Sequence, residues 1–260
     1  MISFDLHTHT TYCDGKNTPE EMVLAALDKG LSCIGFSGHG YAPYDLDCCM
    51  TREGEAAYRE EIAALREKYA GRIRILCGVE RDYFSTEDAS AYDYVIGSVH
   101  YIEKDGETLC VDNTPEISQA AVDEHFGGDW YAFCEAYFKT VSDVARKTKC
   151  NIIGHFDLVS KFNEKMHFFD EHHPRYVSAW RAAAGRLLET GVPFEINTGA
   201  MSRSWRTTAY PSAEMIDYIR ARGGRLVLSS DSHRKQTLCF GFEKYERLGD
   251  SLITNWEELL

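Results

Sequence analysis

The chain has 260 residues, with 28 Lys and Arg against 41 Asp and Glu, which gives a formal net charge of −13. This acidic balance argues against a general nucleic-acid binder, because phosphate backbones are held mainly by surplus lysine and arginine. No apolar run approaches the roughly 20 residues of a membrane span, and the first residues lack the basic and apolar regions of a signal peptide.

Short apolar runs alternate with amphipathic stretches along the whole chain. Seven runs are predicted as strands, at residues 2–6, 32–37, 73–79, 94–99, 151–153, 193–197 and 226–229. Five stretches are predicted as helices, at residues 18–29, 54–69, 130–147, 173–190 and 212–222. The first helix has clear end signals, because Thr18, Pro19 and Glu21 form a capping box and Gly30 follows its end.

This order amounts to roughly seven β-then-α units, with no linker, internal repeat or low-complexity segment. Such alternation predicts a parallel sheet covered by helices, and seven or eight units most naturally close into a barrel. An open doubly wound sheet is the alternative, although no GxGxxG follows the first strand to indicate a dinucleotide site. We therefore expect one α/β barrel domain over residues 1–260.

Metal-binding residue types follow six of the seven predicted strands. In a barrel the active site lies at the carboxyl ends of the strands. The ligand-type residues at these ends are His7 and His9, His39, Glu80, His100, His155, and Asp231 and His233. A single histidine after a strand is usually a hydrogen-bonded loop or core residue, but six strands ending this way is hard to reach by chance.

The spacing within these groups also suits metal binding. Residues i and i+2 of an extended chain point to the same side, so each H-x-H or D-x-H pair presents two ligands together. Imidazole and carboxylate suit Zn²⁺, Mn²⁺ or Fe²⁺, and eight groups exceed the three or four needed for one catalytic zinc. More than one metal ion is therefore predicted. The remaining histidines, His125, His167, His172 and His173, are expected on the solvated surface.

The motifs DLHTHTTYCDG, SGHG, GVE, GSVH, IGHFD and SSDSH resemble the PHP (polymerase and histidinol phosphatase) family, in its stand-alone phosphatase form. The resemblance covers essentially the whole chain and implies a distorted (β/α)7 TIM-like barrel carrying three divalent metal ions. It assigns the first ion to His7, His9, Glu80 and Asp231, the second to Glu80, His100 and His155, and the third to Asp14, His39 and His233. Asp14 stands where many such phosphatases have a histidine, so the third site departs from the family pattern.

Clustered divalent ions suit the hydrolysis of phosphate esters. They lower the pKa of a water to give hydroxide near neutral pH and stabilise both oxygens of an in-line displacement. Glu80 and His233 are accordingly expected to act in catalysis. The resemblance implies L-histidinol phosphate as the substrate, in histidine biosynthesis. Cys13 lies beside the predicted site, but it lacks the C-x5-R loop of cysteine-dependent phosphatases and is expected to be structural.

Cationic side chains near the barrel mouth should hold the phosphate. In similar histidinol phosphatases an arginine in the loop before a Tyr-Pro-Ser contacts it, which indicates Arg203 first and Arg206 second. Lys161 is a weaker candidate of the same kind. Asp157, two residues beyond His155, is expected to bind the cationic substrate or to protonate the departing alkoxide.

Three alternatives remain open. The chain could hydrolyse another small phosphomonoester, such as a nucleotide, sugar phosphate or phosphotyrosine, or be a catalytically silent metal-binding protein. An amidohydrolase-type barrel is disfavoured, because it would need a bridging lysine where this chain has Glu80. The nine cysteines are an odd number without a CxxC pair, which predicts reduced thiols and a cytoplasmic location. No pattern indicates an oligomeric state.

Overall fold

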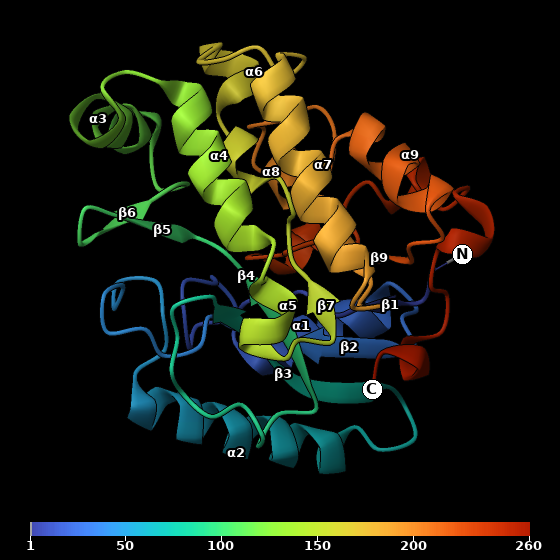
Figure 1. Ribbon diagram of the computed structural model, residues 1–260. Helices are drawn as coiled ribbons and strands as arrows, with labels where there is room; N and C mark the ends of the chain where they lie inside the picture. The colour runs from blue at the N-terminus through green and yellow to red at the C-terminus, as the bar shows by residue number, and fades with distance from the viewer. Residues whose placement is uncertain (1) are drawn as a thin grey trace.

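A parallel sheet of seven strands is the centre of the computed structural model, which describes residues 2–260 (Figure 1). The strand order is β1-β2-β3-β4-β7-β8-β9, and every neighbouring pair is parallel. The strands are β1 (Phe4–Asp5), β2 (Cys33–Phe36), β3 (Arg74–Asp82), β4 (Tyr94–Ser98), β7 (Ile152–Ile153), β8 (Phe194–Asn197) and β9 (Leu226–Ser229). All seven predicted runs are strands, and the predicted distorted (β/α)7 barrel is confirmed.

The sheet closes at the carboxyl ends of its first and last strands. Thr8 and Ser232 form a parallel bridge just beyond β1 and β9. The His9 N–H donates to the Ser232 carbonyl at 2.9 Å, and the Ser232 N–H donates to the His7 carbonyl at 3.0 Å. Closure therefore depends on the two segments that carry the H-x-H and D-x-H pairs, and it holds these pairs side by side.

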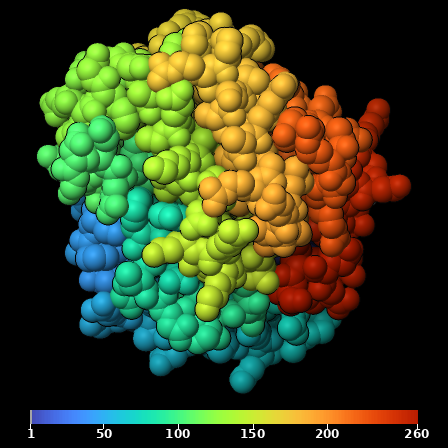
Figure 2. Space-filling view, viewed as in Figure 1, coloured from blue at the N-terminus to red at the C-terminus, as the bar shows by residue number. Residues whose placement is uncertain are grey.

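Helices cover the outside of the sheet. They are α1 (Pro19–Asp28), α2 (Arg52–Lys68), α3 (Pro115–Phe126), α4 (Trp130–Val141), α5 (Val144–Thr148), α6 (Asn163–Met166), α7 (Pro174–Leu188), α8 (Gly199–Ser202) and α9 (Ala213–Ala221). Helices α4 and α7 pack against each other, and in the space-filling view the atoms of α4, α5 and α7 cover this face (Figure 2). The capping box is confirmed, because Thr18 Oγ1 accepts from the Glu21 N–H and the Glu21 carboxylate accepts from the Thr18 N–H.

Three longer parts of the chain differ from the predicted elements. Helix α3, which Thr114 caps and Pro115 begins, was not predicted. The predicted helix at 130–147 is two helices, separated at Ser142 and Asp143, where the Ser142 hydroxyl bonds back to the Lys139 carbonyl. An antiparallel hairpin, β5 (Tyr101–Lys104) and β6 (Glu107–Cys110), was not predicted. Its turn is Asp105-Gly106, and both residues have positive φ. An Asp-Gly pair is a strong sequence signal for a hairpin.

A buried tyrosine anchors the end of β1. The Tyr94 hydroxyl donates to the Leu6 carbonyl at 2.5 Å, directly before His7. A Cβ at Gly35 or Gly78 would overlap the Tyr94 side chain, so glycine at both positions lets the ring cross between strands. The resulting bond fixes the backbone from which the first two histidines project. No helix within residues 2–260 has the length and apolar character needed to cross a membrane.

Candidate metal centre

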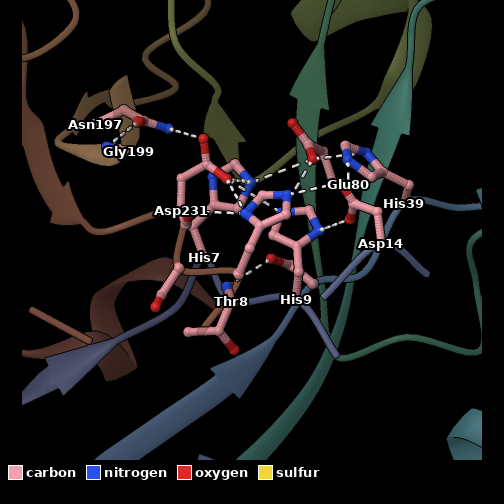
Figure 3. Close-up of polar contacts among 12 residues, drawn as sticks. His7, Thr8, His9, Asp14, His39, Glu80, Asn197, Gly199 and Asp231 are labelled. Atoms are coloured by element: carbon pink, nitrogen blue, oxygen red, sulfur yellow. Dashed lines mark hydrogen bonds and ion pairs between the residues drawn. The ribbon is translucent and has the colours of Figure 1, made fainter. Parts of the chain in front are cut away.

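The strand ends bring nine ligand-type side chains into one cluster (Figure 3). His7 and His9 follow β1, His39 follows β2, His100 follows β4, His155 follows β7, and Asp231 and His233 follow β9. Asp14 comes from the loop after His9. Glu80 lies within β3 rather than at its end, because this strand continues to Asp82.

Glu80 occupies the centre of this cluster and is only 2% exposed. Its Oε2 lies 3.2 Å from His7 Nε2, 3.6 Å from His9 Nε2 and 2.9 Å from His39 Nδ1. Its Oε1 lies 2.8 Å from His155 Nε2 and 3.5 Å from His100 Nε2. One carboxylate oxygen therefore faces the first group of histidines and the other faces the second, as a bridging ligand would.

A third group lies nearer the mouth of the barrel. His233 Nε2 is 2.9 Å from Asp14 Oδ2, and His39 Nε2 is 3.8 Å from Asp14 Oδ1. The side chains of Asp14, His39 and His233 are 28%, 16% and 19% exposed, whereas His7 and His9 are fully buried. The third group is therefore the part of the cluster that a ligand from solvent reaches first.

The unpartnered atoms and the spacing of these ligands are those expected for clustered divalent ions. Four buried ligand atoms, His7 Nε2, His9 Nε2, Asp14 Oδ1 and Glu80 Oε2, have no hydrogen-bond partner within the described chain. Such atoms are costly unless something binds them. Two ligands of one tetrahedral zinc lie about 3.4 Å apart, and His9 Nε2 lies 3.3 Å from Asp231 Oδ1. The residues fit divalent metal ions.

The contacts group these ligands almost as the resemblance implies. Three sets have ligand atoms within 4.8 Å of one another: His7, His9 and Glu80; His39, Glu80 and His100; and His9, Asp14, His39 and His233. His39 thus also approaches the second set, and His9 also approaches the third. The assignment of each ligand to one particular ion stays a prediction.

Neighbouring charges keep the carboxylates of the cluster ionised. Burial alone would raise the pKa of Glu80, but the imidazoles of His7 and His39 hold it well below its ordinary value. Burial likewise opposes ionisation of Asp231, but Arg203 lowers its pKa well below the usual range. Burial, with His233 and His39 nearby, lowers the pKa of His9 to about 3, which leaves its imidazole neutral and free to bind a metal.

A cavity of about 610 Å³ opens above the cluster, and cationic side chains form part of its lining. Arg203 Nη2 lies 2.9 Å from Asp231 Oδ2, and its Nη1 lies 3.1 Å from His233 Nδ1. Lys161 also lines the cavity, as predicted, but its Nζ donates to Asp112 Oδ2 at 2.9 Å. Lys16 and Arg234, which were not predicted as site residues, also line the cavity and have no ion-pair partner among residues 2–260.

Acidic and aromatic side chains also line the cavity. Asp45 and Asp112 contribute carboxylates, and the rings of Tyr44 and Tyr101 meet edge to face at 5.0 Å. Burial raises the pKa of Asp112, but Lys161 lowers it to about 2. Asp45 has no lysine or arginine partner within residues 2–260. The cavity therefore contains side chains of both charges, with Lys161 and Asp112 in direct contact.

Asp157 and Arg206 form a buried pair outside the cavity lining, and the roles predicted for them stay predictions. Asp157 is fully buried and Arg206 is 7% exposed, and neither lines the cavity. Arg206 Nη1 lies 3.3 Å from Asp157 Oδ2, which also accepts from the Ser212 N–H at 3.2 Å. Arg206 contacts Ser160 as well. The pair links the segments after β7 and β8.

Asp157→Asn is therefore expected to lower stability and not catalysis. Breaking one partner of a buried ion pair costs about 3–5 kcal/mol, so the free energy of unfolding should fall by that order in urea titrations. The kcat per folded molecule should stay at the wild-type value. A double-mutant cycle with Arg206→Met checks the pairing. The double variant should lose less stability than the sum of the two single variants. A variant with wild-type stability but a much lower kcat would show instead that Asp157 acts in catalysis.

Three buried polar residues around the cluster were missed. Asp82 accepts from the His100 N–H at 2.9 Å and from the Tyr44 hydroxyl at 2.7 Å. Glu195 and Asn197 extend from β8 toward the ligands. A charged residue at the centre of the apolar run 193–197 was the available signal. Of the histidines expected at the surface, His173 caps α7 and stacks on Tyr131 at 3.9 Å between ring centroids.

A closed parallel barrel with clustered imidazoles and carboxylates at its carboxyl end defines a metal-dependent hydrolase. The PHP domain family model matches residues 5–199. A probable histidinol-phosphatase from Deinococcus radiodurans is 32% identical, over 92% of this chain and 89% of its own length. One from Schizosaccharomyces pombe is 30% identical, over 87% of this chain and 79% of its own length.

Two solved structures share the fold. The putative histidinol phosphatase HisK from Listeria monocytogenes superposes with a TM-score of 0.81 at 21% identity, covering 93% of this chain and 99% of that one. Histidinol phosphate phosphatase from Lactococcus lactis, in complex with zinc, L-histidinol and phosphate, gives a TM-score of 0.68 at 22% identity, over 90% and 87% of the two chains. The chain belongs to the PHP family, as the sequence motifs predicted.

Proposed function

We propose that this chain is a metal-dependent phosphomonoesterase that hydrolyses L-histidinol phosphate to L-histidinol and phosphate in histidine biosynthesis. The observation that carries the proposal is the cavity above the ligand cluster, which both cationic and acidic side chains line. A phosphate ester with a positively charged amine a few bonds away matches this combination of charges. The two probable histidinol-phosphatases among its relatives support the same substrate.

We further propose that three divalent ions, Zn²⁺, Mn²⁺ or Fe²⁺, bind the nine ligands in the sets implied by the family resemblance. Clustered divalent ions supply a water of lowered pKa and neutralise charge on the phosphate. Glu80 holds the first two groups together, and His233 orients the third group at the mouth. Arg203 contacts Asp231 and His233, and its guanidinium would bind phosphate oxygens beside them.

The rest of the proposal concerns the surroundings of the reaction. The substrate enters from the exposed side of the third group, between Arg203 and Lys161, and its amine faces Asp45 and Asp112. All nine cysteines are free thiols, in keeping with the cytoplasmic location we propose. One domain over residues 1–260 also stays a proposal, and residue 1 lies outside the described chain.

A substrate panel tests this function. Metal-loaded protein should hydrolyse L-histidinol phosphate with a kcat/KM about 100-fold above that for phenyl phosphate, because two charge contacts of about 1.4 kcal/mol each discriminate by about that factor. Phosphotyrosine, a nucleoside monophosphate and a sugar phosphate complete the panel. A higher kcat/KM for one of these esters would identify that ester as the substrate instead. Absence of turnover by the metal-replete protein would favour the catalytically silent alternative.

Asp45→Asn should weaken recognition of the cationic ester selectively. Losing one charge contact of about 1.4 kcal/mol raises KM about tenfold, so we expect this increase for histidinol phosphate with kcat unchanged. The KM for phenyl phosphate, which has no amine, should stay constant. Asp47→Asn is the matched control, because Asp47 lies in the same loop but does not line the cavity. An equal KM change for both esters would remove Asp45 from substrate recognition.

A further inference from the structure

Glu195 is a fully buried carboxylate of β8 whose two oxygens contact groups from three other segments. Oε1 lies 2.5 Å from His7 Nδ1 and accepts from the Ser229 hydroxyl at 2.5 Å. Oε2 accepts from the His155 N–H at 2.8 Å and from Asn197 Nδ2 at 3.0 Å. No lysine or arginine within residues 2–260 pairs with it. A buried charge of this kind is retained only when its surroundings compensate it.

The contact with His7 determines which ring nitrogen faces the metal cluster. His7 Nε2 lies 3.2 Å from Glu80 Oε2 and has no hydrogen-bond partner, whereas Nδ1 faces Glu195. A carboxylate can only accept, so it favours the tautomer with the proton on Nδ1. That tautomer leaves the lone pair of Nε2 directed at the cluster, as a metal ligand requires.

A second connection passes from Glu195 through Asn197 to Asp231. Asn197 Oδ1 accepts from the Gly199 N–H at 2.8 Å, which fixes the orientation of the amide. Its Nδ2 then faces both Glu195 Oε2 and, at 3.3 Å, Asp231 Oδ2. Glu195 and Asn197 share one face of β8 because they are two residues apart. This face therefore contacts ligand-bearing segments after β1, β7 and β9.

We infer that Glu195 is the positioning residue of the metal centre, which sets the tautomer of His7 and aligns His155 and Asp231 for the ions that Glu80 bridges. The inference rests on the metal ligands of the proposed function, but it is independent of the substrate. Carboxylates of this kind typically contribute 10- to 100-fold to metal affinity. Glu195 itself contacts neither ion nor substrate and acts through the side chains it holds.

Glu195→Gln tests the inference, because the amide cannot satisfy all four donors. The His155 N–H and the fixed Asn197 amide both donate, so the glutamine oxygen must face them. Its NH₂ group then faces His7 Nδ1 and favours the tautomer with the proton on Nε2. We expect zinc affinity, measured by chelator competition without substrate, to fall about 10- to 100-fold.

Two measurements separate positioning from a general structural role. Burial alone would lower the pKa of His7, but neighbouring carboxylates raise it in the metal-free protein, so long-range ¹H–¹⁵N NMR is run at a pH that leaves the ring neutral. It should show protonated Nδ1 in the wild type and protonated Nε2 in Glu195→Gln. Asp5→Asn is the matched control, because Asp5 is also a fully buried carboxylate, yet it bonds to Ser230 and to the backbone N–H groups of His7 and Cys239 and to no ligand side chain. It should lower the melting temperature but leave zinc affinity intact.

Glu195→Asp keeps the charge and should bind zinc more tightly than Glu195→Gln. It provides the test if Glu195→Gln folds poorly. Zinc affinity within threefold of wild type in a folded Glu195→Gln protein, or an equal loss in Asp5→Asn, would overturn the inference. The proposed substrate does not affect either result. A wild-type protein that binds zinc tightly but ignores histidinol phosphate would contradict only the proposed function.

Discussion

Replacing Glu80 by glutamine is expected to reduce phosphomonoesterase activity by at least about 10³-fold, the loss typical of removing a central electrostatic group from an active site. The same change should lower the number of ions bound per chain, measured by elemental analysis after gel filtration. The physical reason is the position of Glu80, whose two oxygens approach five imidazoles within 3.6 Å. A neutral amide cannot balance ions shared by two groups of histidines.

Glu87→Gln is the matched control for this experiment. Glu87 lies in the loop that follows the same strand, and its carboxylate pairs with Arg52 at the surface at 2.8 Å. This variant should keep its metal content and kcat, since an exposed pair contributes little. A Glu80→Gln protein with full metal content and nearly normal turnover would show that the two groups of histidines bind ions without a bridging carboxylate.

Arg203→Met should lower kcat/KM by about 100- to 1000-fold, because one preorganised donor to the reacting oxygens is worth about that much. Its guanidinium lies against Asp231 and His233, beside the proposed ions, and lines the cavity. The inhibition constant of inorganic phosphate should rise in parallel. Arg203→Lys should be intermediate, since lysine keeps the charge but loses the planar fork.

Metal content must be measured in the same Arg203 variants, because Arg203 also touches Asp231. Arg222→Met is the control for losing an arginine, since Arg222 is exposed beyond α9 and stacks on Tyr218. An unchanged phosphate inhibition constant in Arg203→Met, with full metal content, would assign phosphate binding to Lys16, Arg234 or Lys161. The prediction thus distinguishes loss of phosphate contact from loss of metal.

Local patterns were sufficient for most of the fold. The strands were recognised because each is a short apolar run bounded by turn residues, and the first helix because Thr18, Pro19 and Glu21 mark its start. The hairpin after β4 was missed even though Asp105-Gly106 is a strong turn signal. The break between α4 and α5 at Ser142 and Asp143 has a weaker signal, because a single polar pair often occurs inside a helix.

Local patterns were insufficient for residues whose roles depend on distant partners. Asp157 and Arg206 were assigned to the substrate because both follow strands on the catalytic side. The structure pairs them across 49 positions of sequence in a buried site. Glu195 was passed over because a carboxylate inside a strand has no meaning until its neighbours are known, and its partner His7 lies 188 positions away.

The sequence by itself determined the order of strands and helices, the ligand types at the strand ends and the family. The order of strands and helices repeats with periods of two or 3.6 residues, and the ligand motifs are short contiguous segments, so neighbouring residues reveal both. Only the tertiary structure decided that Arg206 pairs with Asp157 in a buried site, that Glu195 contacts His7, and that Asp45 and Asp112 line the cavity. Those outcomes depend on distances between segments that barrel closure at Thr8 and Ser232 brings together, and neither burial nor charge pairing across strands is encoded in local spacing.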